Sequence, residues 1–123
     1  MKKVLWIGLA GAIGAILRTL IGQVIISDYP IATFAVNIVG TFLLCFIAAG
    51  VLTKLKVKKD LQDVITTGFL GSFTTFSALS METVKFVENG QFMLASFYVG
   101  ISIIAGLSIG TLGFHLGRKK AFE

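Results

Sequence analysis

The sequence predicts an all-α membrane protein whose single domain, residues 1–123, crosses the bilayer four times. Two observations lead to this class. Of the 123 residues, 55% are hydrophobic and only 14% are charged, roughly half the charged fraction of a typical soluble domain. Four apolar segments, each long enough to cross the hydrocarbon core as a helix, are separated by short polar connections. They cover residues 4–26, 31–52, 64–87 and 92–116.

Composition also narrows the function. One cysteine and one histidine exclude a disulfide within the chain and a cysteine or multi-histidine metal cluster. The net charge of +5 comes from basic residues near the ends of the apolar segments, so we expect lipid phosphates, and not nucleic acids, as their partners. No nucleophile–base pair stands out, so we do not expect an enzyme.

Basic residues gather in the regions that would share one side of the membrane. Two precede the first span, four lie between the second and third, and three follow the fourth, against at most Lys85 on the other side. Because basic loops stay in the cytoplasm, we expect both termini there and the chain in the cell membrane. The first apolar run passes Arg18 without a convincing cleavage site, so we interpret it as a retained span and not as a signal peptide.

The first span, residues 4–26, combines glycines with a deep charge. Gly8, Gly11 and Gly14 leave a smooth strip for a neighbouring helix. Arg18 is costly in lipid, so its guanidinium is expected to reach a partner, a polar cavity or the interface. It either contacts a transported substrate or has a structural role, reaching the outer surface or bonding the carbonyls at a helix end. We favour the structural role.

In the second span, residues 31–52, four side chains recur every four residues and share one helix face. The Asn37 amide carries two donors and one acceptor, which must find partners in lipid. It either bonds a neighbouring helix or donates to an anion inside a pore, and the segment alone favours neither role. Cys45 is expected to be a small buried side chain. The face consists of Thr33, Asn37, Thr41 and Cys45.

The third span, residues 64–87, contains a stretch that is poorly suited to a membrane helix. Between Gly68 and Glu82, two glycines and a run of hydroxyl and β-branched residues weaken the helix. Lipid supplies no partners for backbone groups that a break would free. A break at this depth must therefore be covered by protein or line a polar site. The sequence predicts a broken third helix with a site at the break.

Side chains of this stretch suit a small anion. The edge of a phenylalanine ring is partly positive and faces an anion without a formal charge, and Phe73, Phe76 and Leu79 follow one another at intervals of three. Glu82 either pairs with Lys85 along the helix at the membrane border or lies at a pore mouth. Hydroxyls come from Thr75, Ser77 and Ser80.

The last span, residues 92–116, has a polar face and small-residue pairs. Tyr98 and Ser102 are four residues apart and share a face with Gly106. His115 lies at the end of the span, where we expect an interfacial role. Two pairs of glycines suit close helix packing. They are Gly106 with Gly110, and Gly113 with Gly117.

Three motifs, one in each of the first three spans, point to a known family. They are Gly11-x-x-Gly14-Ala15-x-x-Arg18, Val36-Asn37-x-x-Gly40-Thr41-Phe42 and Gly68-Phe69-x-Gly71-x-x-Thr74-Thr75-Phe76-Ser77. Together with the length and the four-span layout, they resemble the Fluc (CrcB) fluoride channels over essentially the whole chain. The resemblance implies a passive channel that exports fluoride, built as an antiparallel dimer of dual-topology subunits with two pores and a central structural sodium ion.

The resemblance also implies residue roles by position. Asn37 would donate to fluoride, and the ring edge of Phe76 would face it. Backbone carbonyls of Gly71 and Thr74 from both subunits would hold the sodium ion. The other groups at or beside the family's pore positions are Arg18, Thr75, Ser77, Leu79, Glu82, Tyr98 and Ser102.

Two features depart from the family pattern. The family's second pore phenylalanine falls at Leu79 and its neighbouring threonine at Ala78. Leucine has no positive edge, so we expect a pore that uses this position to conduct slowly or not at all. The one-sided charge also opposes insertion in both directions. We therefore hypothesise that the chain is one half of a heterodimer of oppositely oriented related subunits, with a homodimer as the alternative.

Two other classes of protein share part of this pattern with a channel. A small multidrug transporter has four spans and a similar length, but it needs a membrane-embedded carboxylate to couple protons to a cationic drug. Here the first span carries Arg18 instead, and Glu82 is near a span end. A non-conducting assembly subunit would use Asn37 and the hydroxyls only to hold helices together.

Overall fold

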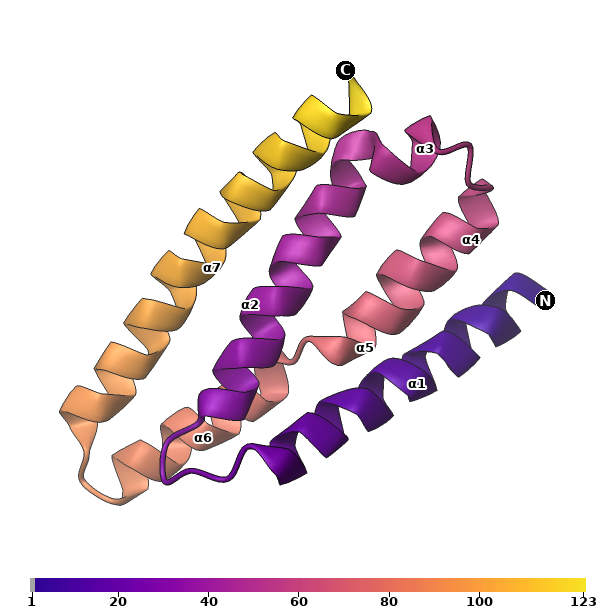
Figure 1. Ribbon diagram of the computed structural model, residues 1–123. Coiled ribbons are helices and arrows are strands. Elements are labelled where there is room, and N and C mark those ends of the chain that lie inside the picture. The colour runs from indigo at the N-terminus through magenta and orange to yellow at the C-terminus, as the bar shows by residue number, and fades with distance from the viewer. Residues whose placement is uncertain (1) are drawn as a thin grey trace.

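The computed structural model describes residues 2–123, and no strand occurs among them. Figure 1 shows helical segments that run back and forth and are joined by short turns. Four of these segments are long and apolar enough to cross a membrane: 2–24, 31–54, 59–88 and 92–121. The predicted all-α, four-span fold is therefore confirmed.

The first and last spans are single helices, and each continues beyond its apolar core at its basic end. They are α1 (Lys2–Val24) and α7 (Phe92–Ala121). Lysine and arginine are good helix formers that extend their charged ends into water, so the helix continues where the apolar run stops. At the end of α7 the guanidinium of Arg118 lies 5.1 Å from the ring centre of Phe122.

The second span changes its helical form towards its end. It consists of α2 (Ile31–Phe46), the π-helical turn η1 (Ile47–Val51) and the short α3 (Leu52–Lys54). Within η1, Gly50 has a φ of 110°, which side-chain-bearing residues rarely adopt. This glycine therefore lets the span bend before the charged loop begins.

The third span is built from four pieces. They are α4 (Lys59–Asp63), the π-helical η2 (Val64–Leu70), α5 (Gly71–Phe73) and α6 (Phe76–Glu88). Between α5 and α6 the backbone is extended, with ψ of 155° at Thr74 and 121° at Thr75. In Figure 1 the chain passes from α5 to α6 as a thin coil. We call these two residues the interruption.

Two pairs of neighbouring segments hold the bundle together. α1 lies along η2 and α5, and α2 lies along α7 (Figure 1). A Cβ atom on Gly14 would collide with the Phe69 carbonyl, and one on Gly113 would lie 2.7 Å from the Phe42 carbonyl. Gly8 and Gly106 have no neighbour within 4 Å of that position, so they take no part in the predicted glycine packing. The glycines that do are Gly11, Gly14, Gly110, Gly113 and Gly117.

The single chain buries few side chains. Among residues 2–123 the buried side chains are all apolar or aromatic, and many large apolar side chains face outward. Outward apolar surface suits helices surrounded by lipid or by another subunit. The buried set is Val36, Ala49, Val51, Leu70, Phe73, Ala95 and Tyr98.

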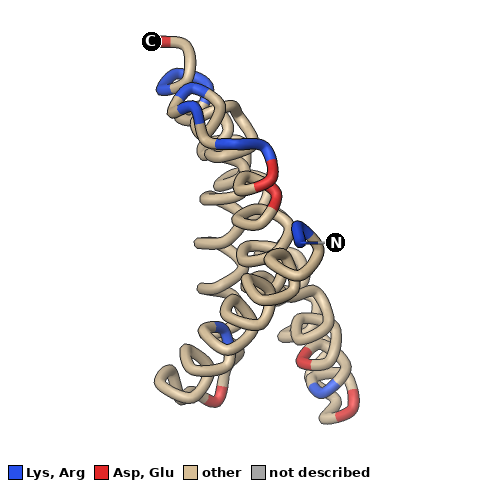
Figure 2. Tube along the Cα trace, turned by 90° about the vertical axis from the view of Figure 1, so that its right-hand side faces the viewer, with Lys and Arg blue, Asp and Glu red and all other residues tan. Residues whose placement is uncertain are grey.

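Charged side chains lie mainly towards the helix ends and in the loops. Figure 2 shows lysines and arginines gathered near the C-terminus and along the neighbouring connection between the second and third spans. Lys3 on α1 pairs with Asp63 at the end of α4, with 2.6 Å between Nζ and Oδ2. This pair ties the start of the first span to the start of the third.

Candidate functional site

A cavity of about 320 Å³ lies where α2, the interruption, α6 and α7 meet. Five predicted pore residues line it, namely Asn37, Thr75, Phe76, Leu79 and Ser102, together with Thr74 of the predicted sodium site. We call it the interruption cavity. Phe76 is 79% exposed, so the cavity is open on its side in the single chain. The other lining residues are Phe34, Ile38, Thr41, Ile103 and Gly106.

Asn37 is bonded to the interruption by both ends of its amide. Its Nδ2 donates to the Thr75 carbonyl at 2.9 Å, and its Oδ1 accepts from the Thr75 N–H at 2.7 Å. The two bonds fix which end of the amide carries the donors. They use the acceptor and one donor, so one N–H of Nδ2 remains for another partner. Asn37 thus bonds a neighbouring span and also keeps a donor beside the cavity.

The interruption changes the partners of the backbone. In a continuous helix the N–H of Thr75 would bond the carbonyl of Gly71, and that of Ala78 would bond the carbonyl of Thr74. Instead, the first goes to Asn37 Oδ1 and the second to Thr75 Oγ1 at 3.1 Å. The carbonyls of Gly71 and Thr74 therefore lose the donors that a helix would give them.

Thr75 begins α6 as its N-cap. Its hydroxyl accepts from the Ala78 N–H and lies 3.1 Å from the Ser77 hydroxyl. Threonine and serine suit this position because a side-chain oxygen satisfies an N–H that the first turn leaves unpaired. Ser77 is exposed and is not among the residues that line the interruption cavity.

Arg18 bonds the end of α5 and does not line the interruption cavity. Its Nε donates to the carbonyl of Ser72 at 3.1 Å. In a continuous helix this carbonyl would accept from the N–H of Phe76. The guanidinium therefore replaces a donor that the interruption removes, and this geometry favours the structural role of Arg18.

We expect Arg18→Leu to lower the free energy of unfolding by about 1.5–3 kcal/mol, because the Ser72 carbonyl loses a charged donor. Denaturant unfolding in detergent measures this, with Lys119→Leu, an exposed residue in the last turn of α7, as the control. Full stability together with altered anion selectivity would instead favour contact between Arg18 and the transported ion.

Glu82 bonds the second span instead of its own helix. The hydroxyl of Thr33 donates to Glu82 Oε1 at 2.7 Å. The ion pairs of the described residues do not include a pair with Lys85, so that one of the two interpretations of Glu82 is wrong. Lys85 is exposed in the last turn of α6, whereas the Glu82 carboxylate is partly buried against α2.

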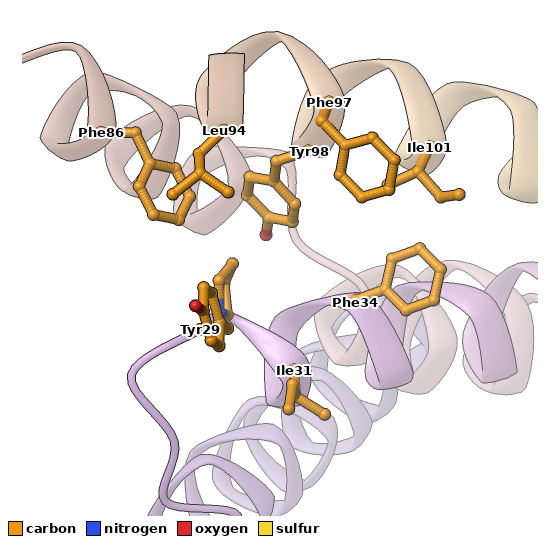
Figure 3. A pocket seen from close by; sticks show the side chains of 9 residues that line it. Tyr29, Ile31, Phe34, Phe86, Leu94, Phe97, Tyr98 and Ile101 are labelled. Atoms are coloured by element: carbon orange, nitrogen blue, oxygen red, sulfur yellow. The ribbon is translucent and has the colours of Figure 1, made fainter. Parts of the chain in front are cut away.

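Tyr98 lines a second cavity, of about 470 Å³, between α7 and the start of α2 (Figure 3). The side chain is 6% exposed, and its ring packs edge-on against Phe86 with 6.0 Å between ring centres. Figure 3 shows the hydroxyl pointing into the cavity, and it has no hydrogen-bond partner among the described residues. Phe34 lines both cavities, so Tyr98 is next to the interruption cavity but outside it.

Comparison with known proteins identifies the family of this chain. A family model described as "CrcB-like protein, Camphor Resistance (CrcB)" matches residues 5–114. The chain belongs to the CrcB family.

Relatives in the CrcB family cover nearly the whole chain. "Fluoride-specific ion channel FluC 1" of Desulfitobacterium hafniense (strain Y51) is 42% identical over 86% of this chain and 95% of its own length. "Fluoride-specific ion channel FluC" of Allorhizobium ampelinum is 38% identical over 96% of this chain and 98% of its own length. "Fluoride-specific ion channel FluC 2" of Staphylococcus saprophyticus is 41% identical over 94% of this chain and 96% of its own length. These relatives are named as channels and not as enzymes, in agreement with the expectation from the sequence.

Several lining residues of this CrcB chain were not singled out from the sequence. Phe34 and Ile38 line the interruption cavity beside Asn37, and Ile103 lines it from α7. The available signal was helical spacing, since Phe34 stands three residues before Asn37. Apolar side chains at such positions are usually packing, so spacing alone did not mark them.

Proposed function

We propose that this CrcB chain forms a fluoride-selective passive channel that carries fluoride out of the cytoplasm. The observation that carries the proposal is the lining of the interruption cavity, which combines an amide, hydroxyls and a phenylalanine ring with no charged side chain. Fluoride holds its water tightly, so neutral donors and ring edges can replace that water without trapping the ion. The names of the relatives support fluoride as the ion.

We further propose that the channel is an antiparallel dimer with two pores. Phe76 is one of the most exposed large apolar side chains although it lines the interruption cavity. A second subunit placed against this open side would cover the ring and close the cavity. Such a cover would also bury part of the outward apolar surface of the single chain.

A structural sodium ion at the dimer centre is the third part of the proposal. The carbonyls of Gly71 and Thr74 have lost their helical donors at the interruption. Carbonyl oxygens at unwound segments of membrane helices suit Na⁺, so the same two carbonyls from both subunits are its proposed ligands. Replacing Na⁺ with a large organic cation during purification should then lower the thermal stability of the dimer.

Efflux from vesicles tests the proposed activity. The purified protein, alone and with any candidate partner chain, is reconstituted into liposomes loaded with fluoride, and a fluoride electrode records release. Vesicles that hold fluoride as well with these proteins as without them would contradict the proposal. A drug-resistance growth assay, set beside a fluoride-sensitivity assay, tests the multidrug-transporter alternative.

We propose that both termini face the cytoplasm and that the partner is an oppositely oriented related chain. The basic residues near the ends of the second and fourth spans support this orientation (Figure 2). The test compares efflux and crosslinked dimers for the chain alone and for the chain with a candidate partner. Robust efflux from the chain alone would overturn the heterodimer.

Leu79→Phe is expected to raise fluoride efflux by about two- to tenfold, because a ring edge next to Phe76 adds about 0.5–1.5 kcal/mol of favourable contact in the interruption cavity. The electrode assay measures the change, and Leu107→Phe on an exposed part of α7 is the control. Unchanged efflux in Leu79→Phe would place the ion path elsewhere.

A further inference from the structure

We propose that the ends of α1 and α4 bind the headgroup of a zwitterionic aminophospholipid, such as phosphatidylethanolamine, from the surrounding membrane. A cavity of about 380 Å³ lies there, away from both cavities described above. We call it the headgroup cavity. Its lining residues are Lys2, Lys3, Trp6, Asp60, Leu61 and Val64. The proposal requires only that the chain spans a membrane, and it does not depend on fluoride conduction.

Ion pairs around the headgroup cavity leave one charge of each sign available. Lys3 Nζ lies 2.6 Å from Asp63 Oδ2 and 3.4 Å from Asp60 Oδ1. The other oxygen of Asp63 accepts from Lys59 at 2.7 Å. Asp63 is therefore paired with both lysines, and Lys3 is already paired with Asp63. Asp60 has only the longer contact, and its side chain is 76% exposed. Lys2 makes no ion pair within 4.0 Å in the part of the chain that the structure describes.

The apolar part of the headgroup cavity lies next to these charges. Trp6 follows Lys2 by one helical turn and is 59% exposed, and Leu61 is also exposed. Tryptophan favours the boundary between headgroups and acyl chains in a membrane. The cavity therefore presents a charged rim towards water and an apolar wall towards the acyl chains, in the order in which a phospholipid presents its own groups.

Chemistry distinguishes an aminophospholipid from other lipids here. The phosphate can bind the Lys2 ammonium, and the lipid ammonium can donate N–H bonds to the free oxygen of Asp60. Phosphatidylcholine has the same charges but no N–H, and phosphatidylglycerol has no cation to meet Asp60. A surface with basic residues alone would favour anionic phosphatidylglycerol. Because Asp60 adds a carboxylate to the rim, we expect phosphatidylethanolamine to be preferred instead.

Native mass spectrometry of the purified full-length protein tests the inference. The protein is mixed with equal amounts of phosphatidylethanolamine, phosphatidylcholine and phosphatidylglycerol that carry the same acyl chains. We expect about two- to fivefold greater retention of phosphatidylethanolamine, the range of an exposed ion pair. Equal retention of all three lipids, or preference for phosphatidylglycerol, would overturn the proposal.

Substitutions test which residues produce the preference for phosphatidylethanolamine. Asp60→Asn is expected to remove the discrimination between phosphatidylethanolamine and phosphatidylcholine, and Lys2→Gln to lower the retention of all three lipids. Lys58→Gln and Lys119→Gln are the controls, because these lysines are not among the lining residues of the headgroup cavity. An unchanged preference in Asp60→Asn, with folding checked by thermal unfolding, would contradict the site. Displacement of the lipid by soluble phosphoethanolamine at equal concentration would contradict a membrane source for the ligand.

Discussion

Replacing Asn37 with alanine is expected to lower fluoride efflux by at least about 30-fold. The substitution removes the proposed pore donor and both bonds to Thr75, so an N–H and a carbonyl are left without these partners at the interruption. A hydrogen bond to a charged group contributes about 1.5–3 kcal/mol, and losing 2 kcal/mol of stabilisation of the passing ion corresponds to about 30-fold in rate. Electrode-recorded efflux from liposomes containing equal amounts of folded protein measures the change.

Two further variants make the Asn37 test specific. Asn89→Ala changes an exposed asparagine in the turn after α6 and should leave efflux unchanged. Asn37→Asp keeps the shape of the side chain but sets a carboxylate oxygen against the Thr75 carbonyl, so it should fail as Asn37→Ala does. Near-normal efflux in both Asn37 variants would show that the ion does not depend on this amide.

Gly14→Ala is expected to lower the free energy of unfolding by about 1–3 kcal/mol, the usual cost of forcing an extra carbon into a packed interface. The new Cβ would overlap the carbonyl of Phe69 and lie 3.2 Å from the backbone nitrogen of Phe73. Both atoms belong to backbone that cannot swing aside, so α1 would have to move away from η2 and α5. Unfolding in detergent and the folded fraction by size exclusion report the loss.

Gly8→Ala is the matched control on the same helix. A Cβ at Gly8 meets no atom within 4 Å. Alanine favours a helix over glycine by up to about 1 kcal/mol, so this variant should be as stable as the native chain or slightly more stable. If Gly8→Ala and Gly14→Ala lose the same stability, then close packing of α1 against the third span is not what Gly14 provides.

Hydropathy was sufficient to predict four spans. It did not predict the residues at which the helices begin and end. The apolar run of the first span starts at residue 4, but α1 already includes Lys2 and Lys3. The third span begins at Lys59, where the 2.7 Å pair with Asp63 joins side chains four residues apart and supports α4. A helix ends where its backbone bonds end, and these continue past the point where the side chains become polar.

Residues of the site could be predicted from the sequence, but their hydrogen-bond partners could not. The hydroxyl-rich stretch and Asn37 were singled out from the sequence, yet nothing in the second span could identify Thr75, 38 residues further on, as the group that Asn37 bonds. The same limit explains Glu82. Local spacing suggested Lys85, whereas the observed partner, Thr33, is 49 residues away. Helical periodicity describes neighbours on one helix and carries no information about contacts between helices.

The interruption also has a consequence for how the protein is made. The third span is the least apolar of the four, and its freed backbone groups bond Arg18 on α1 and Asn37 on α2. Translation delivers the N-terminal segments first, so both side chains reach the bilayer before the segment that needs them. Because of this order along the chain, the partners are already in the bilayer when the third span inserts. The unpaired backbone groups of the third span therefore do not have to face lipid.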